Sequence, residues 1–247
     1  MEPLYGEDLA YIHAVGFGGL ARGAAPEIVR RLKSAAIAVR RVVEVGCGSG
    51  ALTAALVEAG FEVTGIDCSA DLLGMARAAV PQARFVNASI YEAEMPACEA
   101  MIGVGEVLAY HPDPADADRL VWKFFQRAAT ALPAGGVLIF DLIETGEPSL
   151  DGRFWKSGED WAVLAGTEED TASRTVVRRI ETFRKTGELY RRGREIHRVR
   201  LFDTSEVCHR LAGCGFATET AQSYGAQPLP PRRRAFFCIR REASITS

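Results

Sequence analysis

Hydrophobic positions alternate between short apolar runs and amphipathic stretches from residue 41 onward. Residues 41–46 and 61–67 have the length and apolar character of buried strands, whereas 51–59 and 70–79 have the spacing of helices. The pattern continues with predicted strands at 84–87, 99–104 and 136–141 and a predicted helix at 115–132. Strands that alternate with helices of this length are typical of βαβ units. We therefore predict a doubly wound α/β fold.

The pattern changes after residue 143. Residues 144–160 are rich in glycine, proline and charge and are predicted to be a loop. Three strand-like stretches follow, at 161–167, 174–184 and 189–202, the last two joined at Lys185-Thr186-Gly187. A helix is then expected at 204–213, capped by Asp203 or Thr204, and closing strands at 216–224 and 235–241. The whole chain is predicted to form a mostly parallel seven-stranded sheet with an inserted antiparallel sheet.

These elements divide the chain into three parts. Residues 1–40 are predicted to be a helical cap, with helix at 8–14 and a second helix that starts at Pro26. Residues 41–143 and 203–247 are predicted to form the α/β domain. Residues 144–202 are predicted to be the antiparallel insert, serving the substrate or a homodimer contact.

Composition places the chain among ordinary globular proteins. It has 247 residues, of which 48% are hydrophobic, and a formal net charge of −3, which disfavours a dedicated nucleic-acid binder. There is no apolar run long enough for a membrane span and no signal peptide at the start, so a cytoplasmic location is expected. The six cysteines are scattered without metal-ligand spacing, so neither a metal nor a disulfide framework is expected.

The most informative stretch is a strand that runs through Gly46-x-Gly48-x-Gly50 directly into a helix. Such a loop brings main-chain N–H groups close to a nucleotide-like ligand. A dinucleotide site spaces its glycines differently, and the third glycine here comes one residue early. Glu44 beside the loop favours a cationic ligand over a pyrophosphate. Asp67, at the end of the second strand, occupies the usual place for binding both ribose hydroxyls.

With these residues the sequence resembles the class I S-adenosylmethionine-dependent methyltransferases, over nearly all of residues 1–143 and again at 201–241. Further matching stretches are Gly103–His111, which resembles the motif that faces the methyl group, and Leu132–Leu138, which resembles the turn before the fifth strand. Asn87 stands where many members have aspartate. The resemblance implies S-adenosyl-L-methionine as the cofactor, bound by Glu44, Gly46, Cys47, Gly48, Gly50, Asp67, Cys68, Leu72, Asn87, Ala88, Ser89, Gly103, Gly105 and Glu106.

Methyl transfer requires a nucleophile held in line with the methyl group, and a base where the acceptor must lose a proton. His111 follows the fourth predicted strand, at the edge of the sheet where ligands bind. His197 alternates with Glu195 on one face of the insert and is the second candidate. Tyr110 is the third candidate, as a group that orients the acceptor.

The insert also carries a local charge excess. Ten basic residues lie between 174 and 200 against three glutamates, and Arg232-Arg233-Arg234 follows in the closing loop. The basic residues either attract an anionic acceptor or form a solvated face with paired charges. We predict a methyltransferase that acts on nitrogen or oxygen of a small molecule. The alternatives are an RNA or protein methyltransferase that docks through the insert, a nicotinamide oxidoreductase, and a non-catalytic cofactor-binding protein.

Overall fold

The computed structural model describes residues 4–111 and 116–242 and confirms the predicted fold class. A seven-stranded sheet has the strand order β10-β13-β5-β4-β1-β2-β3, and its members β1 to β5 are parallel. Their bounds are Arg41–Val45 for β1, Glu62–Asp67 for β2, Arg84–Asn87 for β3, Ala100–Gly103 for β4 and Val137–Ile143 for β5. The closing strands β10 (Phe216–Ala221) and β13 (Arg233–Arg240) form an antiparallel pair, and β13 is antiparallel to β5.

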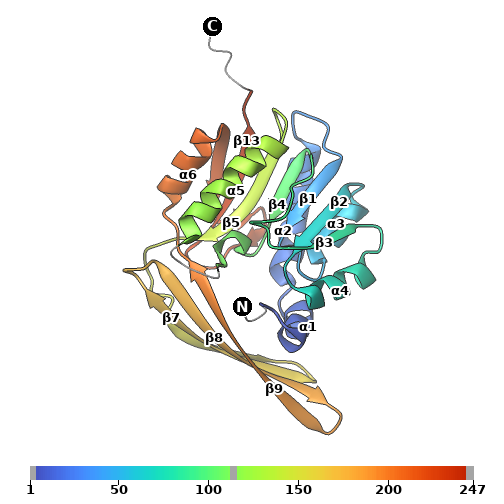
Figure 1. The fold of residues 1–247 in the computed structure, drawn as a ribbon, viewed down its shortest axis with the longest axis vertical. Helices are drawn as coiled ribbons and strands as arrows, with labels where there is room; N and C mark the ends of the chain where they lie inside the picture. Colours follow the sequence, from blue (N-terminus) through green and yellow to red (C-terminus); the bar gives the residue numbers. More distant parts are fainter. Residues whose placement is uncertain (1–3, 112–115, 243–247) are drawn as a thin grey trace.

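Helices cover both faces of this sheet, and the side chains of the strands alternate between two cores (Figure 1). In β5, Leu138 and Phe140 pack with α5 (Ala117–Ala131) and α6 (Thr204–Gly213). Val137 and Ile139 belong to the opposite core, which α2 (Gly19–Lys33) and α3 (Ala51–Glu58) cover. Because the central parallel strands are buried on both faces, most of their residues are apolar, and this composition allowed the strands to be predicted from the sequence. The helix α4 (Ala70–Ala79) lies beside β2 and β3.

The insert is an antiparallel sheet of four strands, in the order β6-β7-β8-β9 (Figure 1). The strands are β6 (Gly152–Ser157), β7 (Trp161–Asp170), β8 (Thr175–Thr186) and β9 (Leu189–Arg200). The prediction of a loop throughout 144–160 was wrong, because 152–157 pair with β7. Every residue of β6 is exposed, so this edge strand lacks the alternation of buried and exposed positions by which strands are recognised.

The N-terminal helices differ from the prediction in one respect. The first, α1, spans Glu7–Gly16, but the second begins at Gly19 and contains Pro26 in its interior. Proline in a helix interior removes one hydrogen bond and normally ends the helix. Here Ala24, Ala25 and Ile28 are buried against the sheet, and this packing outweighs the local cost.

Two short elements complete the fold near the cavity described below. A single helical turn, η1 (Val107–Ala109), follows β4, and a small hairpin of β11 (Ser223–Tyr224) and β12 (Gln227–Pro228) follows β10. The predicted strand at 216–224 is therefore divided in two. Asp203 caps α6 by accepting a hydrogen bond from the Glu206 N–H, as one of the two predicted caps. No helix within 4–111 and 116–242 has the length and hydropathy needed to cross a bilayer.

Candidate active site

A cavity of about 940 Å³ lies at the carboxyl ends of β1, β2 and β4. The glycine loop, the start of α3 and the loops after β2 and β3 line one side of it. The segment after β4, one residue of β8 and the chain between β12 and β13 line the other side, and residues of the N-terminus, α1 and α2 complete the lining. The carboxyl end of a parallel sheet is the usual ligand site in such folds, and the volume suits a small-molecule ligand.

The glycine loop has a conformation that favours glycine at each of its three positions. Gly46, Gly48 and Gly50 all have positive φ, at 64°, 54° and 84°. A Cβ atom on Gly46 would lie 2.3 Å from Cγ1 of Val107, whereas one on Gly48 would meet no atom within 4 Å. The space above Gly48 is therefore open on the cavity side, and a ligand can approach the main chain there closely.

Two buried carboxyl groups flank this loop. Oδ2 of Asp67 accepts a hydrogen bond from the Gly48 N–H at 2.8 Å, and Oδ1 accepts one from the Ser69 N–H at 2.9 Å. Glu44 accepts a hydrogen bond from the Thr53 hydroxyl at 2.5 Å. Burial raises the pKa of Asp67, and it raises the pKa of Glu44 to about 8. A ligand that brings hydroxyl donors or positive charge would therefore stabilise the ionised form of both carboxyl groups.

Most of the residues expected to bind the cofactor line the cavity. Those that do are Glu44, Gly46, Cys47, Gly48, Asp67, Cys68, Leu72, Ser89, Gly105 and Glu106. Four others are absent from the lining: Gly50, Asn87, Ala88 and Gly103.

These four have structural roles instead. The Asn87 side chain is turned back, and its amide donates to the carbonyl oxygens of Asp67 and Cys68 at 3.1 and 3.0 Å. Ala88 donates its N–H to the Asp67 carbonyl, at 3.0 Å. Gly50 caps α3 and lies against Ala76, and a Cβ on Gly103 would collide with Val45 and Val107. The Asn87 amide thus holds the end of β2 rather than facing the cavity.

The expectation that His111 faces the methyl group is not met by its position. His111 is buried outside the cavity lining, where its Nε2 lies 3.0 Å from the Leu108 carbonyl oxygen and its ring stacks on Tyr91. Burial lowers the pKa of His111 to about 4. The turn η1 between β4 and His111 rotates the chain, so that Tyr110 faces the cavity and its neighbour faces the core.

His197 lies one layer behind the cavity. It pairs with Glu195, Nε2 to Oε2 at 2.8 Å, and its ring contacts the rings of Tyr5 and Tyr110, which do line the cavity. The predicted alternation in β9 is correct, since His197 and Val199 are buried while Ile196 and Arg198 are exposed. His197 therefore supports two cavity residues without lining the cavity itself.

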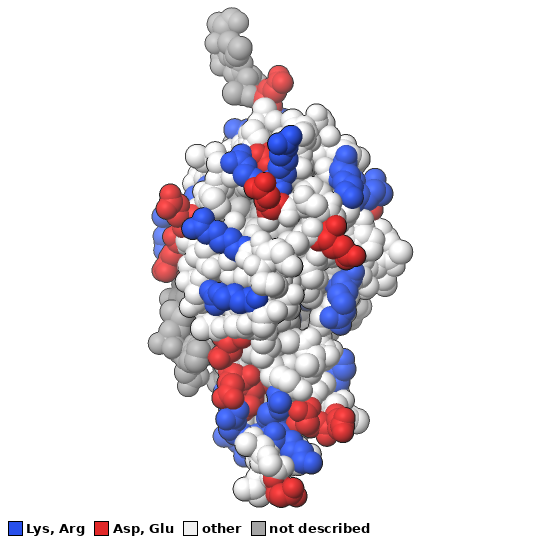
Figure 2. Space-filling model, turned by 90° about the vertical axis from the view of Figure 1, so that its right-hand side faces the viewer, with Lys and Arg blue, Asp and Glu red and all other residues white. Residues whose placement is uncertain are grey.

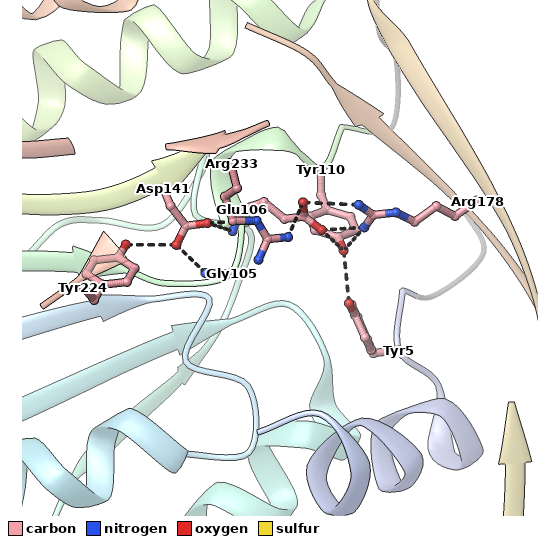
Figure 3. A network of polar contacts seen from close by, with 8 residues as sticks. All are labelled: Tyr5, Gly105, Glu106, Tyr110, Asp141, Arg178, Tyr224 and Arg233. Carbon is pink, nitrogen blue, oxygen red and sulfur yellow. Dashed lines mark hydrogen bonds and ion pairs between the residues drawn. The ribbon is translucent and has the colours of Figure 1, made fainter. Parts of the chain in front are cut away.

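A network of polar contacts lies at the cavity wall that the segment after β4 forms with β8 and β13 (Figure 3). Its centre is Glu106, a residue with positive φ whose carboxylate is bound by Arg178 from β8 and by Arg233 from β13. The Tyr110 hydroxyl donates a hydrogen bond to Oε1 of Glu106 at 3.2 Å. The Tyr5 hydroxyl oxygen lies 3.2 Å from the Tyr110 hydroxyl oxygen. Residues far apart in sequence are thereby joined at one site.

A second carboxylate, that of Asp141, supports this network. Asp141, at 0% exposure, accepts hydrogen bonds from the main-chain N–H groups of Gly105 and Glu106 at 2.9 and 2.7 Å. The Tyr224 hydroxyl donates to it at 2.9 Å (Figure 3). These bonds fix the backbone of the loop after β4, including the strained conformation of Glu106.

Comparison with known proteins agrees with this architecture. A family model described as "Methyltransferase domain" matches residues 42–136. The chain is 28% identical over 221 residues to the putative methyltransferase YqeM of Bacillus subtilis, covering 84% of this chain and 86% of that one. A crystal structure of an S-adenosylmethionine-dependent methyltransferase from Clostridium acetobutylicum superimposes with a TM-score of 0.78 at 18% identity, covering 94% and 98%. The sugar N-methyltransferase KedS8 from Streptoalloteichus superimposes with a TM-score of 0.74 at 20% identity, covering 98% of each chain.

Residues 42–136 are a methyltransferase domain, and the chain has the fold of the class I S-adenosylmethionine-dependent methyltransferases. Its methyl donor is S-adenosylmethionine, as the resemblance predicted. The nicotinamide and non-catalytic alternatives are thereby set aside.

Sequence reasoning missed the residues by which the N-terminus of this methyltransferase reaches the cavity. The N–H groups of Tyr5 and Gly6 donate to the Glu195 carboxylate at 2.8 and 2.9 Å, and the Ser69 hydroxyl donates to the Tyr5 carbonyl at 2.7 Å. Residues 4–6 are thus fastened to the insert and to the start of α4. The cavity-lining His13 follows on α1, and its buried Nδ1 has no hydrogen-bond partner in the described structure.

The basic residues of the insert are mostly paired, which removes the support for a polyanion-binding face. Eight of the ten between 174 and 200 form ion pairs with acidic side chains, and so do the three arginines at 232–234. On the face drawn in Figure 2, basic and acidic side chains are interspersed over the insert. For the exposed residues of the insert, this arrangement is the solvated, paired surface that the sequence left open as one interpretation, whereas Arg178 and Arg233 line the cavity.

Proposed function

We propose that this methyltransferase transfers the methyl group to a nitrogen or oxygen atom of a small-molecule acceptor. The observation that carries the proposal is the position of the cavity, which the N-terminus, the main domain and the insert line together. An acceptor of this site has to enter a cavity of about 940 Å³. A small molecule can do so as a whole, and the similar fold of the sugar N-methyltransferase KedS8 is consistent with this.

The donor set of one half of the cavity fits the cofactor. We infer that the Asp67 carboxylate accepts the ribose hydroxyls, that Cys68, Leu72 and the loop at 89–91 enclose the adenine, and that the glycine loop receives the methionine part. Glu44 is buried beside the loop and favours a cation. When bound, the cofactor supplies an electrophilic methyl group, and the protein's task is to orient the acceptor and exclude water.

We further infer the division of labour within the chain. Residues 41–143 and 203–247 serve the cofactor, and 1–40 cover it. The insert, 144–202, serves the acceptor through Arg178 and through the support that Glu195 and His197 give to Tyr5 and Tyr110. Tyr110 faces the cavity and is the candidate that orients the acceptor, while His111 and His197 hold positions around it.

Two measurements test this proposal. Calorimetric titration should show binding of S-adenosylhomocysteine, and Asp67→Ala should weaken it by roughly 1–3 kcal/mol, because buried ribose hydroxyls lose their charged acceptor. Asp71→Ala, a change of an exposed aspartate in the first turn of α4, is the matched control and should bind as the parent does. Parental affinity in Asp67→Ala would contradict the assigned cofactor site.

The acceptor class is tested with a radiolabelled methyl donor. Label should pass into small molecules of a metabolite extract and not into tRNA or protein from the same cells. Transfer into tRNA or protein would contradict the small-molecule proposal and restore docking through the insert.

A further inference from the structure

The cavity wall around Glu106 contains two arginines that come from different sheets. Arg178 belongs to β8 of the insert and Arg233 to the first position of β13. Both line the cavity, and their side chains are 23% and 14% exposed. They point from opposite directions toward Glu106, whose side chain is 5% exposed (Figure 3).

The Glu106 carboxylate is fully engaged by the protein. Its Oε1 accepts from Arg178 and Tyr110, and its Oε2 accepts from Arg178 at 3.2 Å and lies 2.6 Å from Nη2 of Arg233. Burial opposes ionisation, but Arg178 and Arg233 outweigh it and hold the pKa of Glu106 at about 2. Glu106 is therefore ionised at neutral pH, and its lone pairs are not available to a ligand as a base or an acceptor.

The two guanidinium groups, in contrast, retain unused donors. Nε of Arg233 is buried beside Asp141, at 3.7 Å, and cannot be reached from the cavity, whereas Nη1 of Arg233 has no hydrogen-bond or ion-pair partner among the described residues. Among the interactions within 4–111 and 116–242, Arg178 uses only Nη1 and Nη2, toward Glu106 and Tyr110. A guanidinium group has five N–H donors and no acceptor. A ligand that meets this wall thus encounters N–H groups and tyrosine hydroxyls.

The charges at this wall also favour an anionic ligand. Two guanidinium groups and one carboxylate line the cavity there, whereas Asp141 lies behind the main chain of residues 105–106 and accepts three hydrogen bonds of its own. Asp141 balances part of the charge of Arg233 from 3.7 Å behind the wall, but the surface that a ligand meets carries two guanidinium groups against one carboxylate, which favours an anion. Paired guanidinium groups match the planar or tetrahedral oxygens of carboxylate and phosphate.

We propose that Arg178 and Arg233 form an acceptor subsite that binds an anionic oxygen group, a carboxylate or a phosphate, carried by the methyl acceptor. This inference rests on the proposed function, because it requires a small-molecule acceptor in the same cavity. Glu106 is a positioning residue in this subsite, since it holds both guanidinium groups at the wall. The anionic group anchors the acceptor, and its nucleophilic atom lies elsewhere on the molecule.

The experiment measures anion binding to the protein saturated with S-adenosylhomocysteine. Succinate, inorganic phosphate and the cationic control 1,4-diaminobutane are titrated by calorimetry at constant ionic strength. We expect succinate, phosphate or both to bind with a dissociation constant below about 50 mM and the diamine not to bind. Succinate alone would assign the subsite to carboxylates, and phosphate alone would assign it to phosphates.

Variants then locate the binding. Arg178→Met leaves a buried carboxylate with one partner fewer and risks misfolding, so the informative variant is the charge-balanced pair Arg178→Met with Glu106→Gln. Its anion affinity should fall by about tenfold or more, because a charge-assisted bidentate contact is lost. Arg179→Met is the matched control, since Arg179 is the next residue of β8, is 57% exposed and pairs with Glu168 on the outer face. It should bind anions as the parent does.

Each failure has a distinct result. If S-adenosylhomocysteine binds but no anion does, or if the diamine binds best, this inference is wrong while the proposed function stands. If the paired variant weakens S-adenosylhomocysteine by tenfold and anions bind unchanged, the arginines hold the cofactor's own carboxylate and the inference is again wrong. If the parent does not bind S-adenosylhomocysteine, the proposed function itself fails.

Discussion

Glu44 is predicted to release a proton when the cofactor binds. It is 4% exposed, its one hydrogen-bond donor is the neutral Thr53 hydroxyl, and no basic side chain within the described ranges forms an ion pair with it. Burial therefore raises its pKa from 4.5 to about 8, with a smaller contribution in the same direction from Asp67. At pH 7 the side chain is mostly protonated in the free protein.

The displacement of the pKa from 4.5 to about 8 corresponds to about 5 kcal/mol against ionisation, at about 1.4 kcal/mol for each pH unit. A cation brought to Glu44 by the cofactor favours the carboxylate and lowers this pKa again. Binding at pH 7 should therefore release up to about 0.9 proton, the fraction that Glu44 holds beforehand. Below about pH 5 we expect Glu44 to stay protonated both in the free protein and with cofactor bound, so proton release should vanish.

Calorimetry in buffers with different ionisation enthalpies measures this release directly. We expect proton release when S-adenosylmethionine binds. S-adenosylhomocysteine lacks the sulfonium, so the proton release on its binding shows whether the sulfonium is the cation responsible. Glu44→Gln should abolish the release while keeping the Thr53 contact, and Glu58→Gln, an exposed glutamate in α3, should not change it. A parent protein that binds cofactor at pH 7 without proton release would refute the reasoning.

The same pKa has a consequence for stability. Below pH 4.5 Glu44 is protonated in both the folded and the unfolded chain, and it contributes no pH dependence. Between 4.5 and 8 the unfolded chain loses the proton and the folded chain keeps it, so the free energy of unfolding falls as pH rises. Relative to Glu44→Gln, the parent should lose stability across this window and level off above pH 8.

Two further predictions concern the glycine loop and the N-terminus. Gly46→Ala should lower the free energy of unfolding in urea by about 1–3 kcal/mol, because φ is +64° and the new Cβ would collide with Val107. Gly60→Ala, where φ is +95° but the space is open, should lower it less. In Glu195→Gln only one carbonyl oxygen remains to accept from the N–H groups of Tyr5 and Gly6, so hydrogen exchange of the N-terminal peptide should become faster. An unchanged exchange rate would show that Glu195 does not hold the N-terminus in place.

The parts of the fold that were predictable are those whose signal is local. The central parallel strands β1, β4 and β5 are short, largely apolar runs because both of their faces are buried, and the glycine loop is recognisable because its positive φ angles favour one residue type. The strand β6 and the interior Pro26 were missed for the opposite reason. Their conformation is decided by pairing with β7 and by packing against the sheet, and neither leaves a periodic pattern in the sequence.

The candidate site was predictable on the cofactor side and not on the acceptor side. Glu44, Gly46 and Asp67 lie within 24 residues of one another, at the carboxyl ends of two adjacent strands. The polar network instead joins Tyr5, Glu106 and residues of the insert and of β13, which only the folded chain brings together. Sequence order located the loop after β4 correctly, but one turn of η1 decided that Tyr110 and not His111 faces the cavity.

The charge of the insert shows why a count of residues cannot assign its function. In a strand, successive side chains point to opposite faces, so neighbouring arginines of one strand have different surroundings. Arg178 on the inner face reaches Glu106 at the cavity, and Arg191 on the inner face of β9 reaches Asp8 in α1. Arg179 and Arg192 on the outer face pair with glutamates of the insert itself. The period of the strands therefore divides the local excess of basic residues into two sets. The inner-face set joins the insert to the cavity wall and to α1, and the outer-face set is neutralised within the sheet.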